Sequence, residues 1–309
     1  MQCFSLLSTD QKTQLAAYCI PPKGEIRAML QISHGMCEHF MRYVPFGEFL
    51  AAHGILVFGH DHLGHGNTAP TSDDLGFTAK GGGADLLVED VHWLSVYMKE
   101  QYPSLPLVLF GHSMGSFIAR EVIARHGSTY HGAVYCGTGG PETPAGLGRA
   151  LASLLMILQG ERHRSCLLKK ISFMGYNKKF GKGCDPNAWL TRDEATVLRY
   201  RDDPLCGFVF TLRAYHDLFT LVSRVSKKDW ASRQPKDLPL LLISGEEDPV
   251  GGWGKGVRTV EKRIREAGIQ DLTTSLYPEM RHEILNELDK ETVWEDILKW
   301  LESKLPSQT

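Results

Sequence analysis

Short apolar runs alternate with longer amphipathic segments over most of the chain. The short runs predict strands, and they cover residues 12–20, 27–33, 55–59, 105–110, 133–136, 238–244 and 273–277. The longer segments carry apolar residues at helical spacing and predict helices over residues 43–53, 84–101, 116–125, 257–267 and 291–304. Strands that alternate with helices are typical of a mostly parallel sheet covered by helices on both faces. The pattern therefore predicts an α/β fold.

Residues 141–235 break this alternation. Their first part, residues 147–158, is apolar on several faces, and the stretch 162–182 is strongly basic. That basic stretch contains Arg162, Arg164, Lys169, Lys170, Lys178, Lys179 and Lys182. Because the segment lies between two predicted core strands, we expect an inserted cap, or lid, at residues 141–235. Residues 1–140 and 236–309 then form the core.

Composition narrows the class of protein. The chain has 309 residues, 42% of them hydrophobic, and a formal net charge of −2. These values are ordinary for a globular protein and give no global attraction to nucleic acid, so we expect no nucleic-acid partner. The N-terminus lacks the positive region of a signal peptide, and no segment approaches the roughly 18 apolar residues of a membrane span. Seven cysteines without a CxxC pair predict reduced thiols and a cytoplasmic location.

Residues 111–115 read Gly-His-Ser-Met-Gly and lie between a predicted strand and a predicted helix. In this context a GxSxG sequence forms a sharp turn that holds the serine in a strained backbone conformation, with its hydroxyl exposed at the top of the sheet. The flanking glycines leave room for the neighbouring backbone. Ser113 is therefore the predicted nucleophile of a serine hydrolase.

A serine hydroxyl needs an adjacent base and an orienting acid, which follow the nucleophile along the chain in this type of fold. Asp248 lies in the turn after the strand 238–244, and His282 is the one histidine beyond it. We expect His282 to accept the Ser113 proton and Asp248 to orient the imidazole. Glu246 and Glu247 are alternative acids that are more typical of a solvated turn.

The developing oxyanion needs backbone N–H donors. One is expected from Met114, which follows the nucleophile at the start of a helix, where the helix dipole also favours negative charge. The other is expected from Met36, in the loop 34–39 that follows the strand 27–33. His34 and His39 are expected to brace this loop, and Cys37 to pack beside it rather than to react.

Four further residues, His60, Asp61, His62 and His65, superficially resemble a metal-binding cluster. Glycines at positions 59, 64 and 66 favour a tight structural loop instead, so we expect no metal and no cofactor. The basic stretch 162–182 is expected to be a solvated face of the cap. Its alternative role is a transient contact with anionic lipid head groups at a membrane surface.

Taken together, the motifs resemble the monoacylglycerol lipase and lysophospholipase-like (serine aminopeptidase-type) branch of the α/β-hydrolases. The resemblance rests on motifs at residues 34–39, 61–66, 111–115, 245–250 and 281–287. It implies the α/β-hydrolase fold, a triad of Ser113, Asp248 and His282, oxyanion donors at Met36 and Met114, and no cofactor. It also implies a cap over an apolar acyl tunnel, with which the run 147–158 is compatible.

The chain departs from the mammalian members of this branch at two places. Met36 and Cys37 replace small residues, which predicts a bulkier loop and a narrower acyl entrance. The cap, including residues 185–190, does not match the mammalian lid. Substrate identity is therefore less constrained than reaction type.

Three functions remain in competition. The leading one is hydrolysis of a small-molecule acyl ester, similar to monoacylglycerol or lysophospholipid, through an acyl-enzyme on Ser113. An aminopeptidase or amidase would need acidic groups near the site, whereas the cap is basic. The third is a non-catalytic ligand-binding α/β-hydrolase, against which the complete triad argues.

Overall fold

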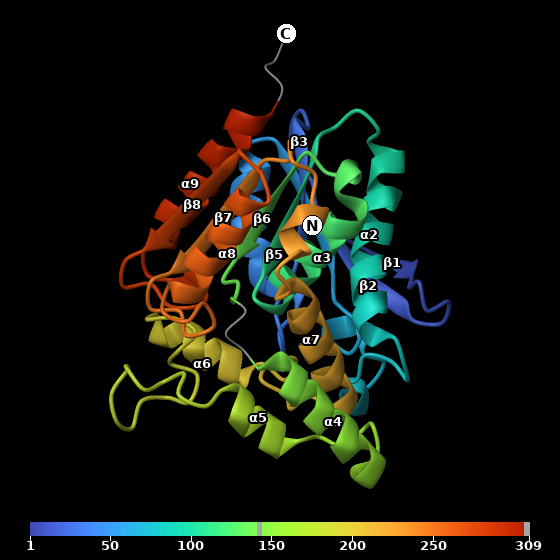
Figure 1. Ribbon diagram of the computed structural model, residues 1–309. Coiled ribbons are helices and arrows are strands. Elements are labelled where there is room, and N and C mark those ends of the chain that lie inside the picture. The colour runs from blue at the N-terminus through green and yellow to red at the C-terminus, as the bar shows by residue number, and fades with distance from the viewer. Residues whose placement is uncertain (141–143, 306–309) are drawn as a thin grey trace.

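The computed structural model describes residues 1–140 and 144–305. They form a central eight-stranded sheet with helices packed around it (Figure 1). The strands are β1 (Gln2–Leu7), β2 (Gln14–Ile20), β3 (Ala28–Ser33), β4 (Ile55–His60), β5 (Leu107–His112), β6 (Gly132–Cys136), β7 (Leu240–Gly245) and β8 (Leu272–Tyr277). Their order across the sheet is β1-β2-β4-β3-β5-β6-β7-β8. Pairs β1/β2 and β2/β4 are antiparallel and the others are parallel. The predicted mostly parallel sheet is confirmed.

Five helices cover the two faces of the sheet: α1 (Val44–Ala52), α2 (Gly83–Gln101), α3 (Met114–His126), α8 (Lys255–Glu266) and α9 (Lys290–Lys304). Alternate residues of each strand point to opposite faces. On β5, Leu109 packs in the apolar cluster shared with α2, α3 and α8, whereas Phe110 packs in the cluster shared with α1 and α9. Each of these five helices coincides with a predicted one.

Strand β1 was not predicted. It carries exposed polar residues, among them Gln2 and Ser5, and has no continuous apolar run. The strand forms because its backbone pairs with β2, from Gln2 opposite Cys19 to Leu7 opposite Gln14. It therefore covers an edge of the sheet that the hydrophobic pattern could not reveal.

Four helices, α4 (Ala145–Gln159), α5 (Cys166–Ser172), α6 (Glu194–Asp202) and α7 (Leu212–Val225), lie between β6 and β7 in the chain. We call this segment the insertion; its first part, residues 141–143, lies outside the described residues. Figure 1 shows the insertion beyond the carboxyl ends of the parallel strands. Here α7 packs against α4 and α3, which joins the insertion to the core. Shorter 3-10 helices are η1 (Phe40–Tyr43), η2 (Gly66–Thr68), η3 (Ser72–Asp74), η4 (Gly127–Thr129), η5 (Trp230–Arg233) and η6 (Ile284–Asn286).

The basic stretch 162–182 is only partly a solvated face. Arg162 donates to Asp74 Oδ1 at 3.1 Å, and Arg164 donates to the carbonyl oxygen of Val209 at 2.9 Å. The Lys179 ammonium lies 4.0 Å from the centre of the Trp253 ring. Several cations of the stretch therefore attach the insertion to itself and to the core.

Four fully buried histidines lie where β3 and β4 end: His34, His60, His62 and His65. His34 Nδ1–H donates to the Gly35 carbonyl oxygen at 2.8 Å, and its Nε2 accepts from the His62 backbone N–H at 3.0 Å. Burial lowers the pKa of His34 to about 4 and the pKa of His60 to about 3. The cluster is consequently made of neutral rings that brace the loops, as expected for His34.

Because these buried rings are neutral, we expect the free energy of unfolding to fall in acid. An unfolded histidine has a pKa near 6.5, so below that pH the unfolded chain binds protons that the folded chain excludes. The free energy of unfolding should therefore fall as the pH drops from about 6.5 towards 4, by up to about 1.4 kcal/mol per pH unit for each such histidine.

His60→Leu tests this dependence because neither ring nitrogen of His60 has a hydrogen-bond partner among residues 1–140 and 144–305. We expect little loss of stability at pH 7. Between pH 6 and 4, the variant should take up about one proton fewer than the wild type on unfolding, as measured from the pH dependence of urea unfolding. His163→Leu, at an exposed position, is the control. An unchanged slope in His60→Leu would contradict the assignment.

Candidate active site

Ser113 occupies the sharp turn between β5 and α3. Its φ is 53° and its ψ is −119°, in a region that non-glycine residues rarely adopt. The Ser113 N–H donates to the Cys136 carbonyl oxygen on β6 at 3.0 Å. A Cβ atom at Gly115 would collide with the Ser33 carbonyl oxygen, and one at Gly111 with the Gly115 carbonyl oxygen. The close packing of β3, β5 and α3 therefore requires both glycines and holds the strained turn.

Asp248 and His282 meet at the carboxyl edge of the sheet. His282 Nδ1–H donates to Asp248 Oδ2 at 2.9 Å, and both residues are buried. The carboxylate also accepts from Ser244 Oγ at 3.1 Å and from the Val250 N–H at 2.8 Å. Glu246 is exposed instead, so the structure pairs the histidine with Asp248 rather than with this alternative.

Ser113 and His282 both line a cavity of about 670 Å³. No hydrogen bond joins their two side chains. Hydrogen bonds of this kind are often long without substrate. The lining is largely apolar and comes from the core and the insertion; it includes Met36, Met114, Phe117, Phe173, Met174, Leu218, Phe219, Val222 and Val250.

The run 147–158, with which the implied acyl tunnel was compatible, does not line this cavity. Residues 147–158 of α4 are absent from the cavity lining, and Leu147 and Ile157 are 76% and 83% exposed. The helix turns these side chains outward, while α7 and α3 supply the apolar cavity wall. Periodicity indicated an apolar surface but could not indicate which side of it faced the cavity.

The loop 34–39 passes directly beside Ser113. A Cβ atom on Gly35 would lie 3.2 Å from Ser113 Cβ. The backbone N–H groups of Met36 and Met114 donate to no other group within the described ranges 1–140 and 144–305. Both residues line the cavity, and Met114 is the first residue of α3. Two unpaired donors are thus available near the serine.

Cys37 is a packing residue in the same loop. Its thiol donates to the Phe208 carbonyl oxygen at 3.1 Å, and burial raises the pKa of the thiol well above its usual value. Its own carbonyl oxygen accepts from Tyr200 Oη at 3.1 Å and from the Gly207 N–H at 3.0 Å. The loop is therefore attached to the insertion, and His39 adds a 2.9 Å contact from Nε2 to Asp203.

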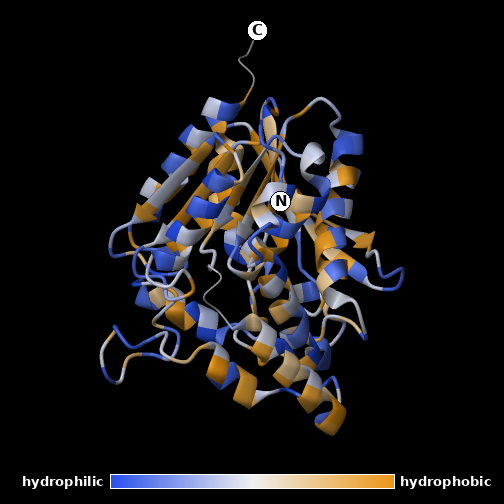
Figure 2. Cartoon of the chain, viewed as in Figure 1, coloured by the Kyte–Doolittle hydropathy of each residue, from blue (hydrophilic) through white to orange (hydrophobic). Residues whose placement is uncertain are grey.

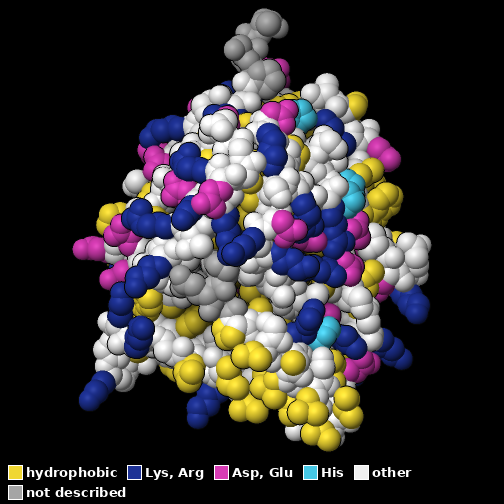
Figure 3. All heavy atoms as spheres, in the orientation of Figure 1, with side chains coloured by type: hydrophobic (Ala, Val, Ile, Leu, Met, Phe, Trp, Pro, Cys, Tyr) yellow, Lys and Arg dark blue, Asp and Glu magenta, His cyan; other side chains and the backbone are white. Residues whose placement is uncertain are grey.

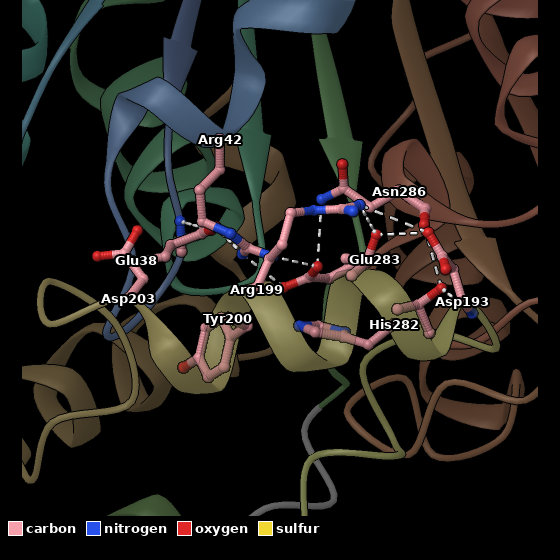
Figure 4. Close-up of polar contacts among 12 residues, drawn as sticks. Glu38, Arg42, Asp193, Arg199, Tyr200, Asp203, His282, Glu283 and Asn286 are labelled. Carbon is pink, nitrogen blue, oxygen red and sulfur yellow. Dashed lines mark hydrogen bonds and ion pairs between the residues drawn. The ribbon is translucent and has the colours of Figure 1, made fainter.

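A buried polar network that the sequence did not reveal surrounds the site (Figure 4). It contains Glu38, Arg42, Tyr43, His112 and Glu283. Burial alone would raise the pKa of Glu38, but His112 and Arg42 hold that pKa well below its ordinary value. Glu38, His112 and Glu283 stand inside the motifs recognised in the sequence. Arg42 lies outside them, and its spacing of four residues from Glu38 is the one sequence signal that could have indicated it.

A segment of the insertion covers the histidine. The Trp189 ring centre lies 5.0 Å from that of His282, and the Trp189 carbonyl oxygen accepts from the His282 N–H at 3.3 Å. Arg281 Nη1 donates to the Ala188 carbonyl oxygen at 2.6 Å. The loop 281–287 is therefore positioned by the insertion as well as by Asp248.

Metal ligands do not converge at the histidine cluster. Among the described residues, one group offers three donor atoms within 4.8 Å of one another, and it is His39, Asp203 and Cys206. His39 already pairs with Asp203, and burial raises the pKa of Cys206.

In the part of the chain that the structure describes, no helix is long and apolar enough to cross a membrane.

Known proteins are similar to this chain over most of its length. The model of the family described as serine aminopeptidase, S33 matches residues 24–289. Monoglyceride lipase of Mus musculus is 28% identical over 92% of this chain and 85% of its own length, and monoacylglycerol lipase of Mycolicibacterium smegmatis is 26% identical over 92% and 91%.

A solved carboxyl esterase of Bacillus coagulans, in complex with glycerol, is 32% identical, with a TM-score of 0.90 and 98% of each chain covered. The sheet, the turn at Ser113 and the family match lead to one assignment. The chain has the α/β-hydrolase fold and belongs to the serine aminopeptidase S33 family.

Proposed function

We propose that this chain hydrolyses small acyl esters of lipid-like character through an acyl-enzyme on Ser113. The chain is a carboxylic ester hydrolase, as its lipase and esterase relatives are named. The observation that carries the substrate class is the 670 Å³ cavity, which is mostly apolar and contains Ser113 and His282. A monoacylglycerol- or lysophospholipid-like ester fits a cavity of this character and size.

In the proposed reaction, Ser113 Oγ attacks the acyl carbon while His282 Nε2 takes the hydroxyl proton. Asp248 accepts the Nδ1–H of His282, which holds the required tautomer and stabilises the imidazolium. The N–H groups of Met36 and Met114 receive the negative oxygen. The C–O bond to the alcohol then breaks, and His282 returns its proton to the departing oxygen. Water attacks the acyl-enzyme by the same route and releases the acid.

An aminopeptidase or amidase is the alternative on the same site. A substrate amine would need a free carboxylate in the cavity. Within the described part of the lining, the carboxylates are Glu38 and Glu283, and both are bonded to Arg42. Lys169, Lys170 and Arg201 also line the cavity. The charges around the site therefore favour an ester over a cationic amine substrate.

The insertion, residues 141–235 in our assignment, acts as a cap that contacts a lipid surface. Its helices α4 and α5 carry an apolar patch made of Leu147, Leu154, Ile157, Leu158, Leu167 and Ile171, each at least 46% exposed. Figure 3 shows this patch as a continuous yellow area at the end of the molecule formed by α4 and α5, and Figure 2 shows the same helices as apolar. Exposed Lys170 lies beside it in the sequence. An apolar patch with nearby cations suits the interface of a membrane.

Ser113→Ala tests the proposed nucleophile. We expect ester hydrolysis to fall on the order of 10⁶-fold and labelling by a fluorophosphonate to disappear, with unchanged thermal unfolding. The assay uses a chain-length panel of acyl esters that includes monoacylglycerol, lysophospholipid and aminoacyl amides. Wild-type turnover of amides but not of esters would support the alternative. A wild type that neither labels nor turns over any member would refute catalysis.

Asp248→Asn tests the orienting carboxylate. The amide no longer accepts the Nδ1–H in the same way, so His282 takes the wrong tautomer and kcat should fall roughly 10³–10⁴-fold. Glu246→Gln, two residues away and exposed, is the matched control and should keep wild-type kcat. If kcat fell in Glu246→Gln but not in Asp248→Asn, Glu246 rather than Asp248 would be the carboxylate that orients His282.

Ile157→Ser combined with Leu158→Ser tests the membrane contact. Both side chains are more than two-thirds exposed, at 83% and 71%. Removing them should weaken flotation with phosphatidylcholine vesicles by at least about tenfold, because each buried aliphatic side chain contributes roughly 1.5–3 kcal/mol. Hydrolysis of a soluble short-chain ester should be unaffected. Leu7→Ser, on the edge strand β1, is the control and should float like the wild type. If the double variant also floated like the wild type, the apolar patch would not be the membrane contact.

A further inference from the structure

Arg42 connects two buried carboxylates, Glu38 from loop 34–39 and Glu283 from loop 281–287 (Figure 4). Its Nη1 donates to Glu38 Oε2 at 2.6 Å and to Glu283 Oε1 at 2.7 Å, and its Nη2 donates to Glu283 Oε2 at 2.6 Å. Both glutamates are only 3% exposed. The two parallel bonds to Glu283 are the bidentate geometry that a planar guanidinium offers and an ammonium does not.

At one end of this connection, Glu38 determines the path of loop 34–39. Its Oε1 accepts from the Gly35 N–H at 2.6 Å and from Tyr43 Oη at 2.7 Å. Gly35 directly precedes Met36, whose N–H is a proposed oxyanion donor. The direction of that donor therefore depends on where the Glu38 carboxylate is held.

At the other end, Glu283 directly follows the proposed base, His282. The Glu283 N–H donates to the Leu190 carbonyl oxygen at 2.7 Å, and its carboxylate accepts from Asn286 Nδ2 at 3.1 Å. With the side chain held by Arg42 and the backbone held by the insertion, the peptide after His282 has little freedom to rotate.

The ring of His112 closes the network. Its Nδ1 lies 3.3 Å from Glu38 Oε1 and 3.0 Å from Tyr43 Oη, and its Nε2 lies 3.3 Å from the His282 carbonyl oxygen. Although burial alone would lower the pKa of His112, the bond to Glu38 raises that pKa above its ordinary value. The ring therefore links Glu38 to the backbone of the proposed base.

The network therefore pairs two buried carboxylates, Glu38 and Glu283, with the guanidinium of Arg42, and the ring of His112 contacts Glu38. Removing one partner from such a buried pair leaves an uncompensated charge and is strongly destabilising. These groups all contact the loops that carry the proposed base and one proposed oxyanion donor.

We infer that Arg42 is a positioning residue that couples the placement of the oxyanion donor in loop 34–39 to the placement of the base in loop 281–287. The inference rests on the proposed roles of Ser113, His282 and Met36. Arg42 itself is not among the described residues that line the 670 Å³ cavity, so it acts through Glu38 and Glu283 rather than by touching substrate.

Arg42→Lys tests the coupling because it keeps the charge and removes the planar fork. With a soluble short-chain ester we expect kcat to fall about 10–100-fold while KM stays within about twofold, since misplacement of reacting groups by about 1 Å has effects of this size. The rate of fluorophosphonate labelling should fall by a similar factor.

Arg125→Lys is the matched control. Arg125 also bonds several carboxylates, those of Asp85, Glu89 and Glu121, and none of these residues lines the cavity within the described chain. This variant should lower the melting temperature as Arg42→Lys does but keep wild-type kcat. A wild-type kcat in Arg42→Lys, or an equal loss of kcat in both variants, would overturn the inference.

Glu283→Gln provides a second test, from the other end of the connection. The neutral amide cannot accept both of the bonds that Arg42 donates to the carboxylate, so kcat for the short-chain ester should fall while KM stays within about twofold, as in Arg42→Lys. A wild-type kcat in Glu283→Gln would contradict the coupling. If the wild type itself failed to hydrolyse esters or to label, the proposed function would fail instead.

Discussion

The close approach of three backbones at the turn after β5 is the constraint on which the site depends. At Gly111 and Gly115 there is no space for a Cβ atom, because the carbonyl oxygens of α3 and β3 occupy it. The strain of the positive φ at Ser113 is maintained by this packing and by the bond from its N–H to β6. Once the turn is held in this way, the serine, the start of α3 and loop 34–39 necessarily adjoin one cavity.

The buried polar groups around that turn are accommodated in two different ways. The histidines behind loop 34–39 avoid charge, since burial keeps their rings neutral. On the other side of the loop, Glu38 and Glu283 are paired with the guanidinium of Arg42, and the ring of His112 contacts Glu38. Both arrangements attach the loops around Ser113 to the core by buried hydrogen bonds. The insertion completes the arrangement by contributing the carbonyl oxygens of Trp189 and Leu190.

Much of the fold was predictable because the parallel strands are buried on both faces and therefore appear as apolar runs, as at residues 105–110 and 238–244. Strand β1 was not predicted because its two packed side chains, Phe4 and Leu6, alternate with exposed residues, so that no continuous apolar run marks the strand. The run 147–158 was recognised as apolar on several faces, but hydropathy does not report what covers each face; in the structure Leu151 and Leu155 pack against the core, whereas Leu147 and Ile157 are exposed. The role of Arg42 was not predicted because its bidentate partner, Glu283, lies 241 residues further along the chain.

By itself the sequence determined the α/β class, the turn that holds Ser113, and Asp248 and His282 as its candidate partners. Those conclusions follow from local spacing and chain order, which are properties of a one-dimensional pattern. The tertiary structure alone decided which carboxylate meets His282, which side chains line the cavity at Ser113, and that two loops share one guanidinium. These are contacts between segments distant in sequence, and they arise only when the sheet and the insertion pack together.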